Sequence, residues 1–115
     1  KDMKEQEFRY EAKGHALVIH LPKELDHHNC RGLKVETDLL LAENYVKKIV
    51  FDFSNTVFMD SSGIGVLLNR YKQMERSGGK VAICGAGPQV QRVLNIGGIG
   101  KLVCRYDSME AAMAE

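Results

Sequence analysis

The chain has 115 residues, which is enough for one domain with a hydrophobic core of its own. Hydrophobic residues make up 44% of it and charged residues 27%, as in folded rather than disordered proteins. With 16 basic and 15 acidic residues, the net charge of +1 and the scattered basic positions argue against charge-driven binding to nucleic acid or to a membrane.

Other features of the sequence predict a cytoplasmic location. No apolar run approaches the roughly 20 residues that a membrane-spanning helix needs, and residues 1–7 lack the apolar core of a signal peptide. Cys30, Cys84 and Cys104 are odd in number and form no CxxC pair. We therefore predict that all three are buried free thiols in a reducing compartment.

The first elements in chain order are two short strands, residues 8–13 and 16–21, which flank Gly14 as a hairpin. Pro22 closes the second strand, and Asp26 is a suitable N-cap for a helix that reaches about residue 44 or 45. Residues placed at helical spacing on its apolar side are Cys30, Leu33, Thr37, Leu40, Leu41 and Tyr45.

Residues 48–53 have the strongest strand pattern, a nearly unbroken apolar run that predicts a central strand covered on both faces. A second long helix then follows a loop and ends at the glycines 78–79. Its apolar stripe consists of Ile64, Leu67, Leu68, Tyr71 and Met74. Strands that alternate with helices in the latter two-thirds of the chain imply right-handed crossovers and a partly parallel sheet.

The last third of the chain continues the alternation of strands and helices. Residues 81–84 predict a buried strand, Pro88 begins a short helix, residues 102–105 predict a last strand, and Ser108 can cap a terminal helix through residue 113. The predicted fold is therefore a single α/β domain over residues 1–115, with a mixed sheet and the order ββαβαβαβα.

The segment Asp60-Ser61-Ser62-Gly63 stands where the second long helix begins. Asp60 or Ser61 would serve as the N-cap, which is a sufficient structural reason for either residue type. Two adjacent serines cannot both be the cap, however, and Gly63 weakens a helix without helping its cap. This excess over simple capping favours a functional role for the segment.

A helical wheel suggests an interface along the same helix. If the apolar stripe points inward, Ser62, Val66, Asn69 and Gln73 point outward. Such a small, uncharged face is more common at protein interfaces than on idle surface, although a chance run of four residues would explain it as well.

Several kinds of active site do not fit the sequence. Asp60 stands where a hydrolase elbow around Ser62 needs its first glycine, and Val90 stands where a dinucleotide loop beginning at Gly85 needs its third. The neighbours His27 and His28 face different directions on a helix, so no metal site is predicted.

Two segments together are specific to one family. Glu24-Leu25-Asp26-His27-His28 begins the first helix, and residues 58–67 (Phe-Met-Asp-Ser-Ser-Gly-Ile-Gly-Val-Leu) begin the second. Both closely resemble the bacterial anti-sigma-factor antagonists of the STAS domain family, and residues 70–73, the glycines 78–79 and the helix at Pro88 add to this similarity. The resemblance covers nearly the whole chain and points to the antagonists that act in sporulation.

The resemblance implies a partner-switching regulator and not an enzyme. The unphosphorylated form would capture an anti-sigma factor that is also a serine kinase of the GHKL type, and so would free a sigma factor. The kinase would phosphorylate Ser62 to release the antagonist, and a metal-dependent serine phosphatase would reset it. No cofactor is implied. Partner contacts are implied for Asp26, His27, Asp60, Ser61, Ser62, Gly63, Val66 and Asn69.

Two alternatives remain at this stage. Asp52, at the end of the central strand, occupies a position similar to the phosphoacceptor of a receiver domain, but the paired acidic residues of that family are missing after the earlier strand. The chain could also be the STAS regulatory domain of a transporter. The phosphorylatable serine, which such domains often lack, and the prediction that both ends of the domain are accounted for argue against this alternative.

Overall fold

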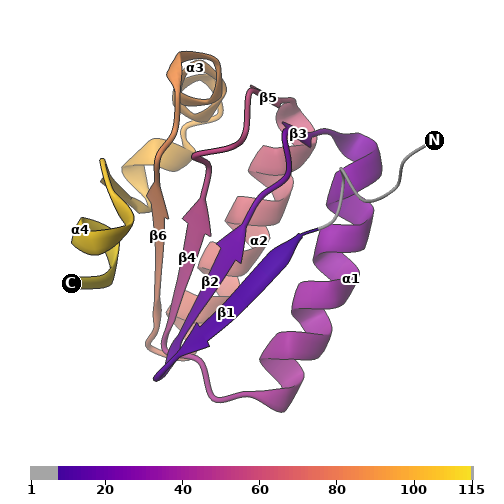
Figure 1. The fold of residues 1–115 in the computed structure, drawn as a ribbon. Helices are drawn as coiled ribbons and strands as arrows, with labels where there is room; N and C mark the ends of the chain where they lie inside the picture. The colour runs from indigo at the N-terminus through magenta and orange to yellow at the C-terminus, as the bar shows by residue number, and fades with distance from the viewer. Residues whose placement is uncertain (1–7, 115) are drawn as a thin grey trace.

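A computed structural model describes residues 8–114 as one five-stranded mixed sheet with helices on both faces (Figure 1). The strands are β1 (Arg9–Lys13), β2 (Ala16–His20), β4 (Lys48–Asp52), β6 (Lys80–Cys84) and β7 (Cys104–Tyr106), in the spatial order β1-β2-β4-β6-β7. β1 runs antiparallel to β2, and the other neighbours are parallel. Gly14 makes the hairpin turn with a φ of 61°, so the predicted hairpin is confirmed.

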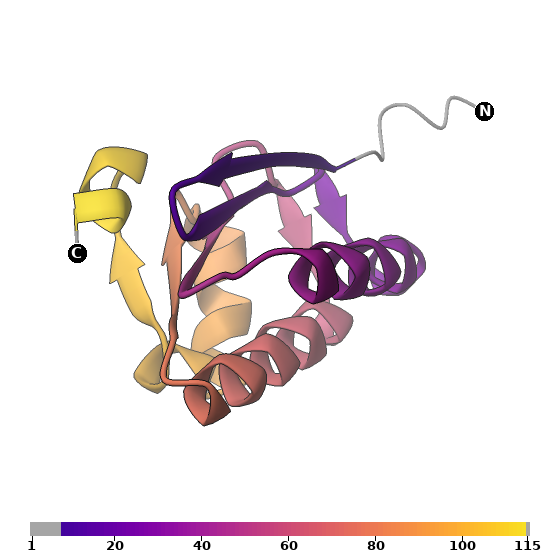
Figure 2. The same ribbon diagram turned by 90° about the horizontal axis from the view of Figure 1, so that it is seen from below.

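The helices cover the two faces of the sheet unequally, as Figure 2 shows. α1 (His27–Glu43), α2 (Ser61–Arg76) and α3 (Pro88–Ile96) lie on one face, where the main core contains Phe51 of the central strand. The short α4 (Met109–Ala114) covers the other face, where Val50 and Ala112 belong to a smaller core. Alternate residues of β4 thus enter different cores, which confirms that the central strand is covered on both sides.

Three short elements are absent from the predicted order. β3 (Glu24–Leu25) and β5 (Phe58–Met59) pair in parallel as a separate two-stranded sheet, and η2 (Ile99–Lys101) is a 3₁₀ turn after α3. A strand of two residues has no detectable period, so neither β3 nor β5 can be recognised from the pattern alone. The last strand also begins at Cys104, two residues later than predicted.

Two predictions about burial were wrong. Tyr45 is 69% exposed because α1 ends at Glu43, and its ring instead packs edge-on against His15, with 4.9 Å between the ring centroids. Cys30 and Cys84 are buried free thiols as predicted, but Cys104 is exposed on the edge strand β7.

No helix between residues 8 and 114 has the length and apolar character needed to cross a bilayer. Residues 1–7, in which we predict no signal peptide, and Glu115, the last residue of the predicted domain, lie outside the described range.

Candidate functional site

The β3–β5 ladder places the starts of α1 and α2 side by side. Leu25 pairs with Met59, and each is followed directly by the N-cap of a helix, Asp26 for α1 and Asp60 for α2. The backbone N–H of Asp60 also donates to the carbonyl oxygen of Leu25, at 3.3 Å. The two aspartates therefore lie at one edge of the molecule, and Figure 1 shows β3 and β5 together at that edge.

The two carboxylates cap these helices in different ways. Asp26 Oδ1 accepts from the backbone N–H of Asn29, at 2.9 Å. Asp60 Oδ1 accepts from the N–H of Ser62 at 2.8 Å, and its Oδ2 accepts from the N–H of His27, the first residue of α1, at 3.2 Å. Asp60 thus places one negative charge at the positive ends of two helix dipoles. Ser61, the other candidate cap, is instead the first residue of α2.

Gly63 has a structural role that the sequence did not reveal. A Cβ at this position would lie 2.6 Å from the Cγ and Sδ of Met59 and 3.2 Å from Cδ2 of Leu25. Met59 and Leu25 are buried side chains of the β3–β5 ladder. The absence of a side chain at Gly63 therefore lets α2 pack closely on that ladder, so this glycine is not evidence of function.

The predicted outward face of α2 requires a correction. Ser62, Val66 and Gln73 are half-buried, and Val66 packs against the main core. Asn69 is exposed as predicted, but the other exposed positions of α2 are Ser61, Gly65, Lys72, Glu75 and Arg76, so the face that points to solvent is rotated by about one residue. The side of α2 that carries Arg70 is buried against α1, where Arg70 bonds to Lys34 and Asp38. Ser61 is exposed, whereas Ser62 is half-buried.

A groove of about 290 Å³ runs between α1 and α2 beside the paired helix starts. It brings together four of the predicted contact residues, namely His27, Ser62, Val66 and Asn69. It also contains residues that the sequence analysis did not select as partner contacts, namely Cys30, Arg31, Lys34, Gly65 and Arg70.

Burial, with smaller contributions from the nearby carboxylates of Asp60 and Asp26, raises the pKa of the Cys30 thiol to about 11. Cys30 is thus a neutral thiol in the groove at physiological pH.

Arg70 joins the two helices that form the groove. Its side chain is only 2% exposed, and Nη2 donates to the carbonyl oxygen of Lys34 at 3.0 Å, to Thr37 Oγ1 at 2.6 Å and to Asp38 Oδ1 at 2.6 Å. Nη1 donates to Gln73 Oε1 at 2.8 Å. The hydrogen bond from Arg70, followed by that from Lys34, lowers the pKa of Asp38 below its ordinary value of 3.8. The sequence analysis did not predict that Arg70 is buried, because a charged residue next to the apolar stripe of this helix gives no signal of burial.

Two exposed apolar side chains stand next to the caps. Val57 is 59% exposed and Phe58, in β5, is 42% exposed. The side chain of Gln89 in α3 exchanges hydrogen bonds with the backbone of Met59: the Met59 N–H donates to Oε1 at 2.9 Å, and Nε2 donates to the carbonyl oxygen at 3.2 Å. These bonds hold β5 in place, so Val57 and Phe58 are further candidates for partner contact.

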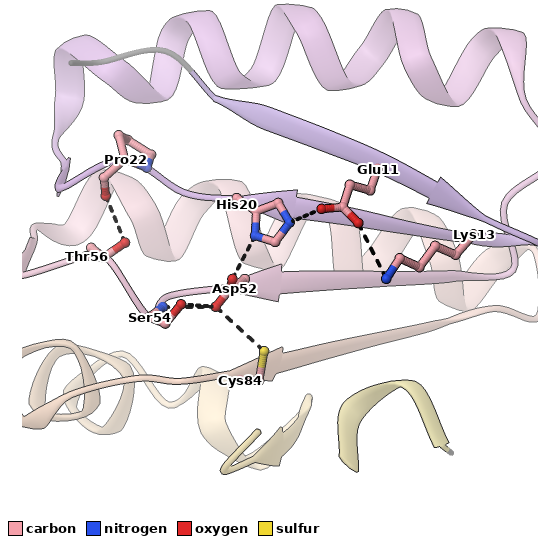
Figure 3. Close-up of polar contacts among 8 residues, drawn as sticks. All are labelled: Glu11, Lys13, His20, Pro22, Asp52, Ser54, Thr56 and Cys84. Atoms are coloured by element: carbon pink, nitrogen blue, oxygen red, sulfur yellow. Dashed lines mark hydrogen bonds and ion pairs between the residues drawn. The ribbon is translucent and has the colours of Figure 1, made fainter. Parts of the chain in front are cut away.

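Asp52 lies in a separate polar network, drawn in Figure 3. Its Oδ2 lies 2.7 Å from His20 Nδ1, and His20 Nε2 lies 2.9 Å from Glu11 Oε2. Its Oδ1 accepts from the backbone N–H and the hydroxyl of Ser54, at 3.0 and 2.7 Å. Burial alone would raise the pKa of Asp52, but the hydrogen bonds from Ser54 and His20 lower it below 3.8. Both carboxylate oxygens are engaged, which argues against a receiver-type phosphoacceptor.

Comparisons with known proteins agree with the arrangement of these elements. The STAS domain model matches residues 7–112. The anti-sigma F factor antagonist of Paenibacillus polymyxa is 37% identical over 99 residues, covering 86% of this chain and 85% of that protein. SpoIIAA in its unphosphorylated form has a TM-score of 0.81 at 29% identity, covering 91% of this chain and 92% of that one. The Bacillus cell fate determinant SpoIIAA in the phosphorylated form has a TM-score of 0.74 at 28% identity, covering 94% and 97%.

Proposed function

Because this chain belongs to the STAS domain family, we propose that it is an anti-sigma-factor antagonist, which binds an anti-sigma factor and so releases a sigma factor. The observation that carries this proposal is the pair of adjacent helix starts, where the exposed Ser61 stands beside the groove between α1 and α2. The 37% identity to a protein named anti-sigma F factor antagonist supports the same function.

The switch in this proposal is phosphorylation of a serine at the start of α2. The resemblance implied Ser62, but the helical wheel behind its outward position was wrong by about one residue, and Ser61 is the exposed serine. We therefore assign the phosphate to Ser61. The relative SpoIIAA has been described in unphosphorylated and phosphorylated forms, which supports a switch of this kind.

The physical effect of the phosphate follows from its position. At a helix N-terminus it meets a favourable dipole worth about 0.3–1 kcal/mol, so the modified protein stays folded. It adds a charge of about −1.5 to −2 beside Asp26 and Asp60, which makes the surface hostile to a partner that fits the neutral serine. A loss of about 1.4 kcal/mol already lowers affinity tenfold.

The remaining parts of the proposal concern the partners. The anti-sigma factor itself carries the serine kinase activity, and a metal-dependent serine phosphatase restores the binding form. The chain is then a ligand and a substrate rather than an enzyme, and it acts in the cytoplasm without a cofactor. Asp60 serves this surface mainly through its two cap bonds, which hold the helix starts together.

Phosphorylation by the purified anti-sigma factor and ATP, followed by mass spectrometry, tests the proposal. We expect Ser61→Ala to remove the phosphate and Ser62→Ala to retain it, with both variants folded. Ser61→Asp should bind the anti-sigma factor at least about tenfold more weakly than the unphosphorylated wild type. Phosphate on Ser62 would reinstate the sequence-based assignment. A wild-type protein that neither binds the anti-sigma factor nor accepts phosphate would refute the function.

A further inference from the structure

The groove between α1 and α2 has an unbalanced charge. Arg31, Lys34 and Arg70 line it, and no carboxylate among residues 8–114 does, although those of Asp60 and Asp26 lie beside it near Cys30. The carboxylate of Asp38 is already shared by Lys34, at 3.0 Å, and Arg70, at 2.6 Å. The side chain of Arg31 is exposed and has no ion pair or hydrogen bond with any residue between 8 and 114. An uncompensated positive charge therefore stands on α1 at the mouth of the groove.

The lining of the groove is largely apolar between its charged residues, and the groove has enough open volume to admit a side chain. Its lining includes the buried Cys30 thiol, the half-buried Val66 and the bare backbone at Gly65. A Cβ at Gly65 would meet nothing within 4 Å, so α2 leaves open space at this point. The groove volume of about 290 Å³ is roughly ten times the ~30 Å³ share of one water molecule. A side chain from another protein can enter without rearrangement of the helices.

Arg70 adds a donor on the same side. Its Nε is buried and has no hydrogen-bond partner within residues 8–114, whereas both terminal nitrogens are engaged. An acceptor that enters the groove would approach a guanidinium already held in position, and such charge-assisted contacts are directional.

From these features we propose that the groove binds an acidic segment of the anti-sigma factor, which inserts an apolar side chain onto the floor and pairs a neighbouring carboxylate with Arg31. This inference rests on the proposed function and specifies the partner chemistry of the same surface. A basic segment fits less well because the positive rim would repel it. A purely apolar segment fits less well because it would leave the positive rim unpaired.

The location of the groove links this contact to the switch. Ser62 lines the groove, and the exposed Ser61 directly precedes it at the N-terminus of α2. A phosphate on Ser61 adds to the negative charge of Asp26 and Asp60 at this end of the groove and so repels the acidic segment. Release of the partner then follows from like-charge repulsion, without movement of α1 or α2.

Two variants with matched controls test the groove. Arg31→Glu reverses the unpaired charge, and Arg92→Glu makes the same change at an exposed position of α3 outside the groove. Gly65→Leu places a side chain in the open space at this exposed position of the groove lining, and Gly32→Leu makes the same change on α1, where a Cβ would lie 3.8 Å from Phe8. Thermal melts check that all four variants are folded.

Isothermal titration of each unphosphorylated variant with the purified anti-sigma factor gives the result. We expect Arg31→Glu and Gly65→Leu each to raise Kd at least about tenfold, and the two controls to change it by less than about threefold. Raising the salt from about 50 to about 300 mM should weaken wild-type binding more than Arg31→Glu binding. Tighter or unchanged binding by Arg31→Glu would overturn the acidic chemistry.

The outcomes separate this inference from the proposed function. If wild type binds and Ser61→Asp does not, while Arg31→Glu and Gly65→Leu bind as wild type does, the groove inference is wrong and the function stands. If the wild-type protein does not bind the anti-sigma factor at all, both are wrong. Loss of binding in Gly32→Leu or Arg92→Glu to the same extent would also overturn the groove, because the effect would not be local.

Discussion

Replacing Asp38 with alanine would leave the guanidinium of Arg70 without its counter-charge. Arg70 is 2% exposed, and removing one partner of a buried ion pair costs about 3–5 kcal/mol. The side chain of Asp38 is 46% exposed, however, so water partly screens the pair and the lower end of that range is too high. The bonds from Arg70 to Thr37 and Gln73 remain. We expect a loss of about 2 kcal/mol in the free energy of unfolding, or roughly 8 °C in Tm.

A double variant shows whether the buried charge causes this loss. Arg70→Met keeps most of the buried stem without the charge, so Asp38→Ala/Arg70→Met should be more stable than Asp38→Ala alone. Urea unfolding followed by circular dichroism measures both. A cost below about 0.5 kcal/mol for Asp38→Ala, as for an ordinary surface substitution, would refute the reasoning, because Arg70 would then be adequately solvated without its partner.

The same ion pair predicts a pH dependence. Because Arg70 lowers the pKa of Asp38 in the folded protein, the stabilisation is complete above the ordinary value of 3.8 and is lost as the pH falls through the lower, folded value. The stability difference between wild type and Asp38→Ala should therefore be constant from pH 5 to 7 and shrink below about pH 3.8. The lowered pKa values of Asp52 and Glu11 affect both proteins equally.

The other predictions concern the paired helix starts. Gly63→Ala should lower the free energy of unfolding by about 1–3 kcal/mol in a urea melt, because its methyl group overlaps Met59; an unchanged midpoint would mean that Met59 can move aside. Asp60→Ala should cost about 1–2 kcal/mol through the loss of two cap bonds, whereas Ser61→Ala should stay within about 0.5 kcal/mol. Calorimetry compares the last two, and equal losses would contradict the assignment of Asp60 as the cap.

Much of the fold could be predicted because it depends on local patterns. The unbroken apolar run at residues 48–53 identified the central strand, and Asp26 was recognised as an N-cap from its position before a helical period. The Asp60–Gly63 segment was found because it carries more turn and cap residues than one helix start needs. Each of these signals lies within a few neighbouring residues of the chain, so no tertiary contact is required to detect it.

The sequence by itself therefore determined the order of the longer helices and strands, the cap at Asp26 and the location of the serine pair. Only the tertiary structure decided which serine is exposed, because the phase of α2 depends on the burial of Arg70 against α1. It also decided that β3 and β5 pair, and that their pairing brings two helix starts from distant parts of the chain to one edge. The groove between α1 and α2 exists only as a gap between side chains of both helices, and no pattern within one segment can encode such a gap.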